Sequence, residues 1–78
     1  RYSGFFGTDL DLYLREKNIK EINLVGVCTN ICVLYTAADA RNIGYTVNIY
    51  RDGVATTDEA AHEFALKEAE NTLGCNII

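Results

Sequence analysis

Segments with helical spacing alternate with short apolar runs along this chain, and that alternation limits the fold more than any other feature. Strands that alternate with helices through short connections pair in parallel by right-handed crossovers. The sequence therefore predicts an α/β chain in the order α-β-α-β-α-β. The expected helices span residues 8–17, 31–43 and 56–71, and the expected strands span 22–27, 45–50 and 75–78.

Local signals mark the ends of these elements. Thr8 is the expected N-cap of the first helix and Asn18 its expected stop. Gly44 is placed to follow the second helix as its C′ residue. The run Arg51-Asp52-Gly53 predicts a turn after the second strand, and a capping box in Thr56–Glu59 opens the third helix.

Three parallel strands with three helices are few for a closed fold, because an all-parallel sheet needs helices on both faces. The last expected strand, Cys75–Ile78, also has no polar tail. We therefore expect the chain to be one part of a three-layer α/β/α fold with a parallel sheet. Missing residues or another chain would supply the rest of the sheet.

Composition excludes several classes of partner. The net charge is −4 and the basic residues form no cluster, so nucleic acid is not an expected partner. No apolar run approaches the roughly 18 residues of a membrane span, and no signal peptide is recognisable. Three cysteines are an odd number, which favours free thiols in the reducing cytoplasm.

One cysteine falls where a strand should turn into a helix. In Gly26–Val33, Cys32 would lie in the first helical turn, where unpaired N–H groups and the helix dipole favour a thiolate. Cys32 is thus a candidate nucleophile, and Cys28 could contribute its backbone N–H. Inert buried thiols remain the alternative for both cysteines, as does a redox pair, although their spacing is not C-x-x-C. Cys75 is interpreted as packing.

These residues carry a resemblance. The segment Gly26–Val33, continued by Thr36–Ala40, resembles the nucleophile segment of the isochorismatase-like cysteine hydrolases, with the nicotinamidases as the nearest members. Arg1–Phe5 with Gly7–Leu10 is similar to the segment that follows the catalytic lysine in that family. The stretch Thr57–Leu66 and then Asn71–Gly74 agrees as well, so the resemblance covers essentially the whole chain.

The resemblance implies roles for individual residues. Cys32 would attack the carbonyl carbon of an amide and form a thioester, and the backbone N–H groups of Cys28 and Cys32 would form the oxyanion hole. The peptide bond from Val27 to Cys28 should be cis. Tyr2 and Phe5 match positions beside the substrate pocket, with packing in the core as the alternative.

The resemblance also places some of the family's groups outside this chain. The general base is an aspartate near the N-terminus of the full domain, and its partner is a lysine just upstream of Tyr2. We therefore expect residues 1–78 to be the C-terminal half of a single domain whose N-terminal half is absent. No cofactor or metal ligand is expected within the chain, and a divalent metal such as zinc would bind through the missing half. Asn30 stands where many relatives have Asp, and His62 is interpreted as structural or exposed.

The implied reaction is hydrolysis of a small amide, first of all nicotinamide to nicotinate and ammonia, a reaction of NAD metabolism. Isochorismate hydrolysis and cleavage of other small amides or ureido compounds are alternatives, as is a non-catalytic α/β assembly module. The expected partners are the missing N-terminal half, a small-molecule amide substrate and further copies of the chain in a homo-oligomer. Neither nucleic acid nor a membrane is expected.

Overall fold

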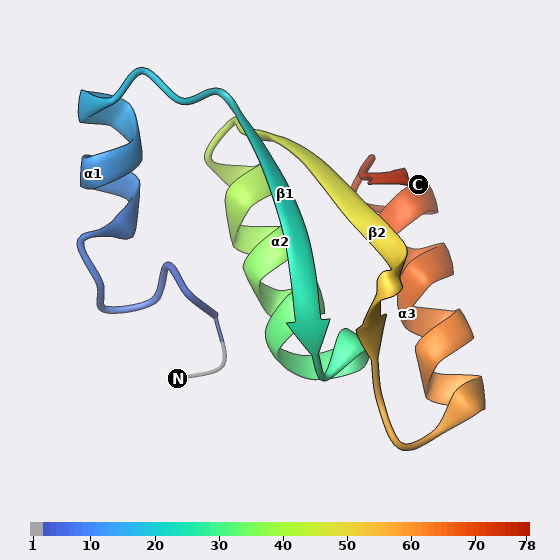
Figure 1. The fold of residues 1–78 in the computed structure, drawn as a ribbon. Helices are drawn as coiled ribbons and strands as arrows, with labels where there is room; N and C mark the ends of the chain where they lie inside the picture. Colours follow the sequence, from blue (N-terminus) through green and yellow to red (C-terminus); the bar gives the residue numbers. More distant parts are fainter. Residues whose placement is uncertain (1–2) are drawn as a thin grey trace.

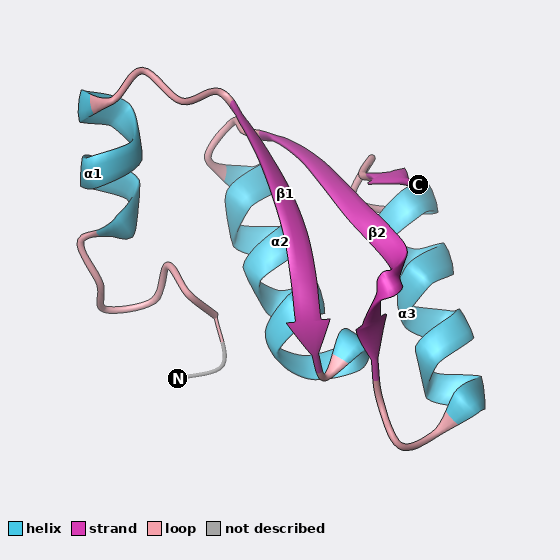
Figure 2. Cartoon of the chain, viewed as in Figure 1, coloured by secondary structure: helices cyan, strands magenta, loops and turns pink. Residues whose placement is uncertain are grey.

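The computed structural model describes residues 3–78 and follows the predicted order α-β-α-β-α-β (Figures 1 and 2). A five-residue π-helical turn, η1, is inserted between the first strand and the second helix. The elements are α1 (Leu10–Glu16), β1 (Glu21–Val27), η1 (Thr29–Val33), α2 (Leu34–Asn42), β2 (Thr46–Ala55), α3 (Glu59–Asn71) and β3 (Asn76–Ile77).

The three strands form one parallel sheet in the order β1-β2-β3, so β1 lies at an edge. The register pairs Ile22 with Val47 and Asn48 with Asn76. Helices α2 and α3 pack against each other and lie on one face of the sheet (Figure 1). This arrangement confirms the α/β class and the parallel pairing predicted from the alternation of segments.

The core lies between the sheet and these two helices. Ala37 and Ala40 of α2 are completely buried, and small side chains there let the helix approach the strands closely. Leu66 and Ala69 supply the buried face of α3. The buried residues that form this single cluster are Val33, Ala37, Ala40, Tyr45, Val47, Ile49, Val54, Leu66, Ala69 and Cys75.

The opposite face of the sheet is not covered by any helix of residues 3–78. An amide ladder crosses it, in which Asn48 donates to Asn23 at 2.8 Å and Asn76 donates to Asn48 at 2.8 Å. Further along the strands the face is apolar and open, since Val25 is 65% exposed and Ile78 60% exposed. The described residues thus provide two layers of the three that the sequence predicts.

The turn expected at Arg51–Gly53 is wrong, because β2 continues through these residues to Ala55. The pairing of β1 with β2 shows how the strand continues past these residues. Leu24 pairs with Ile49 and Gly26 pairs with Val54, so a single residue of β1, Val25, spans the same stretch as four residues of β2. The chain bulges there and then resumes parallel pairing, which appears as a kink in β2 (Figure 2).

This bulge depends on a glycine. A Cβ atom on Gly53 would lie only 2.7 Å from Cγ1 of Val25. We therefore expect Gly53→Ala to lower the free energy of unfolding by about 1–3 kcal/mol, because the extra methyl group overpacks the bulge. Gly4→Ala is the matched control, since its Cβ would meet its nearest neighbour, Leu10, at 3.7 Å. Urea denaturation of both variants checks the difference, and equal midpoints would contradict it.

The helix ends differ slightly from expectation. The N-cap of α1 is Asp9 rather than Thr8, although the Thr8 hydroxyl still accepts from the Leu10 N–H at 3.3 Å. In α3 the capping group is the Asp58 carboxylate, which accepts from the N–H groups of Ala60 and Ala61. Asn18 and Gly44 follow the ends of α1 and α2, as predicted, and both have a positive φ.

Helix α1 is held to the rest of the molecule by the buried Tyr45. The Tyr45 hydroxyl donates to the Asp11 carboxylate at 2.7 Å, and the Arg15 guanidinium lies 4.6 Å from the centre of the ring. Burial and the hydrogen bond to Asp11 raise the pKa of Tyr45 above its ordinary value. Within residues 3–78, no helix is long and apolar enough to cross a membrane.

Candidate active site

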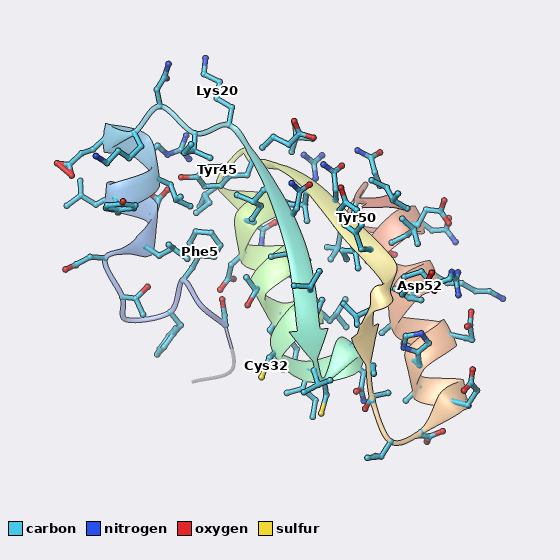
Figure 3. The ribbon with its side chains drawn as sticks, viewed as in Figure 1. Phe5, Lys20, Cys32, Tyr45, Tyr50 and Asp52 are labelled. Carbon is cyan, nitrogen blue, oxygen red and sulfur yellow. The ribbon has the colours of Figure 1, made fainter. Side chains whose placement is uncertain are left out.

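The carboxyl end of β1 delivers the segment Cys28–Cys32 to the edge where α/β sheets commonly place their sites (Figure 3). The peptide bond between Val27 and Cys28 is cis, as the resemblance implied. After it the chain enters η1 directly, so Cys32 lies in a π-helical turn and not in the regular first turn of an α-helix. This wider turn is continuous with α2.

The side chain of Cys32 is exposed and lines an open pocket of about 230 Å³. The pocket is mostly apolar, because β1 contributes aliphatic side chains to its wall. Helix α2 adds Thr36. Its lining residues are Leu24, Val25, Val27, Cys32, Val33 and Thr36. A small apolar pocket with one nucleophilic atom at its wall is the arrangement expected of a site for a small, largely apolar ligand.

The hydrogen bonds around Cys28 bear on the predicted oxyanion hole. The Cys28 carbonyl accepts from the N–H groups of Ile31 at 3.1 Å and Val33 at 3.2 Å. Both bonds hold the Cys28 carbonyl within the turn that carries Cys32. The oxyanion role of the Cys28 and Cys32 N–H groups stays a prediction.

A contact between Thr29 and His62 was not foreseen from the sequence. Thr29 is 2% exposed, and its hydroxyl lies 2.9 Å from Nδ1 of His62 on α3. The sequence predicts only that His62 is structural or exposed, and it does not indicate which residue His62 contacts. The two residues are 33 positions apart, so no local pattern could have paired them.

Asn30 carries an unusual feature within the same turn. Its Oδ1 atom is buried and has no hydrogen-bond partner among residues 3–78. A buried carbonyl oxygen without a donor is uncommon in a completed site. The position where the resemblance finds Asp in many relatives therefore holds an unused acceptor here.

The structure brings neither of the two predicted substrate-contacting aromatic residues into the Cys32 pocket that it describes. Tyr2 is outside the described residues. Phe5 stacks on Tyr45 with ring centroids 5.9 Å apart and does not line the Cys32 pocket, so a substrate contact by Phe5 stays a prediction. Cys75 is 3% exposed within the core, and burial raises the pKa of its thiol, with a smaller opposing effect from Arg41. Its expected packing role is confirmed.

Metal ligands do not gather in the described part of the chain. No group of three or more His, Cys, Asp or Glu side chains within residues 3–78 could hold a metal ion. His62 and Glu59 do line a second open pocket of about 130 Å³ at the carboxyl end of β2. That pair falls short of the three or four protein ligands that zinc sites use.

Comparison with known proteins identifies the class. The model of the isochorismatase domain matches residues 1–77, so the chain belongs to the isochorismatase family. It is 47% identical over 77 residues to the isochorismatase family protein PncA of Bacillus subtilis, a match that covers 99% of this chain and 42% of that protein.

Solved structures give the same result. The nicotinamidase SaPncA from Staphylococcus aureus matches with a TM-score of 0.98 and 47% identity, over 100% of this chain and 50% of that one. The pyrazinamidase of Pyrococcus horikoshii in complex with zinc matches with a TM-score of 0.95 and 40% identity, over 100% of this chain and 43% of that one. The chain thus spans half or less of the length of these relatives.

Proposed function

We propose that this chain carries the nucleophile of a cysteine amidohydrolase that converts nicotinamide to nicotinate and ammonia. The observation that carries the proposal is the exposed Cys32 at the wall of an apolar pocket, in the turn that follows the cis peptide at Cys28. Similarity to the Staphylococcus aureus nicotinamidase supports the choice of substrate. Isochorismate and ureido compounds are the alternative substrates.

In this mechanism the Sγ atom of Cys32 attacks the amide carbonyl carbon and gives up its proton to a general base. The oxygen of the tetrahedral intermediate accepts hydrogen bonds from the N–H groups of Cys28 and Cys32. The C–N bond then breaks, ammonia leaves with the proton, and a thioester to Cys32 remains. Attack by water on the thioester releases nicotinate and restores the thiol.

The base and its lysine partner would come from the N-terminal half of the same domain. We use the term assembled domain for this chain together with that half. Two features support such a partner. The β1 edge is unpaired within residues 3–78, and the open sheet face exposes Val25 and Ile78. Parallel sheets are rarely left uncovered on one face, so the N-terminal half would pair with β1 and cover this face.

A divalent metal does not enter the proposed steps. The Pyrococcus horikoshii relative was solved in complex with zinc, but the described residues of this chain offer no ligand set that fits zinc. Any metal of the assembled domain would be held by the N-terminal half. We place the reaction in the cytoplasm, where the three free cysteines would stay reduced.

The test is an assay of the assembled domain for release of nicotinate and ammonia from nicotinamide, with isochorismate and a ureido compound assayed in parallel. We expect nicotinamide to have the highest kcat/KM of the three. Higher kcat/KM for another substrate would replace nicotinamide and keep the cysteine hydrolase. No turnover of any amide by a folded assembled domain would favour the non-catalytic module.

A further inference from the structure

We infer that His62 is a positioning residue that holds the nucleophile Cys32 in place through Thr29, an inference that rests on the proposed function. The link is the 2.9 Å hydrogen bond between His62 Nδ1 and the Thr29 hydroxyl. Thr29 is 2% exposed, so water cannot readily replace His62 as its partner. His62 touches no reacting atom in this account and acts only by fixing the turn.

Thr29 controls the turn because it is the first residue of η1 and Cys32 is the fourth. The Thr29 carbonyl accepts the N–H of Leu34, which closes the π-helical turn around Cys32. On the other side, Thr29 follows Cys28, whose carbonyl is also bonded within the turn. A shift of Thr29 would therefore move the backbone on both sides of the nucleophile.

His62 is well suited to hold Thr29, because α3 is fixed independently of this contact. The Asp58 carboxylate caps the start of the helix, accepting from Ala60 at 3.0 Å. Leu66 and Ala69 bury the same helix against the core, each with 1% exposure. Loss of the His62 contact would therefore release the turn without releasing α3, and this separates positioning from general stability.

The geometry at Nδ1 suggests a discriminating pair of substitutions. An asparagine amide can occupy the place of Nδ1, whereas the longer glutamine amide reaches the place of Nε2. An amide carries both a donor and an acceptor, so it can bond to the Thr29 hydroxyl whichever of the two groups donates the hydrogen. His62→Asn should thus keep the contact that His62→Gln loses, although both side chains are polar and neutral.

The experiment compares kcat and KM for nicotinamide in the assembled domain. We expect His62→Gln and Thr29→Val to lower kcat by about 10- to 100-fold with KM changed by less than about threefold, because a displaced nucleophile reacts slowly with bound substrate. His62→Asn and Thr29→Ser should restore most of kcat. The double variant His62→Gln/Thr29→Val should be no slower than either single variant, and Glu70→Gln on the exposed side of α3 should match the wild type.

A second readout separates this inference from the proposed function. The rate at which iodoacetamide alkylates Cys32, read from the Cys32 peptide by mass spectrometry, reports on the turn without any catalysis. We expect His62→Gln and Thr29→Val to change this rate together and His62→Asn to leave it near the wild-type value. A wild type that does not hydrolyse nicotinamide would defeat the proposed function alone. The positioning role would be overturned if His62→Asn and His62→Gln had equal effects. It would also be overturned if His62→Gln changed neither kcat nor the alkylation rate of Cys32.

Discussion

Replacement of Cys32 by alanine is expected to lower nicotinamide hydrolysis by the assembled domain on the order of 10⁴-fold or more, as loss of a nucleophile does in other hydrolases. The reason is that Cys32 supplies the atom that forms the thioester, and no other cysteine lines its pocket. Nicotinate release at saturating nicotinamide measures the effect. Cys32→Ser should be similarly impaired, because a hydroxyl is a much weaker nucleophile near neutral pH.

Cys75→Ala is the matched control for the loss of a thiol. Cys75 is buried in the core and does not line the Cys32 pocket. This variant should therefore keep kcat within about threefold and lose a little stability. Activity of Cys32→Ala close to that of Cys75→Ala would show that another group attacks the substrate.

Leu66→Ala is expected to give a large loss of stability, lowering the free energy of unfolding of the assembled domain by about 2–5 kcal/mol. Leu66 is 1% exposed and fills the space between α3 and the rest of the core cluster. Alanine is a strong helix former, so the substitution does not lower the helix propensity of α3, and the cavity accounts for the loss of stability. Urea denaturation, followed by far-UV circular dichroism, gives the free energy.

Lys67→Ala is the matched control for Leu66→Ala, because Lys67 is the next residue and lies on the exposed side of α3. This variant should change the free energy of unfolding by less than about 0.5 kcal/mol. A similar loss in both variants would mean that the cavity left at Leu66 does not account for the loss. The packing of α3 on the sheet would then need another explanation.

Much of the fold could be predicted because the signals were local. The β-branched run at Ile22–Val27 and the left-handed stops at Asn18 and Gly44 each depend on a few neighbouring residues. The extension of β2 through Arg51–Gly53 could not be read locally, since these residues have turn composition. Parallel pairing that resumes at Gly26 with Val54 overrides that composition.

The site divides in the same way. Cys32 was found from its place between a strand and a helix, and the cis bond before Cys28 came from the family resemblance. The π-helical form of the turn has no distinct sequence signal. The contact of Thr29 with His62 joins two segments that are brought together only when α3 packs beside η1, so it required the structure.

Alkylation and activity, followed together in one sample, show whether Cys32 is the attacking residue. The assembled domain is treated with iodoacetamide, and samples are assayed for nicotinamide hydrolysis while each cysteine peptide is quantified by mass spectrometry. We expect activity to fall in proportion to modification of Cys32 while Cys75 stays unmodified. Saturating nicotinamide should slow the loss of activity and the modification of Cys32 equally. Full activity in protein whose Cys32 is completely alkylated would show that Cys32 is not the nucleophile.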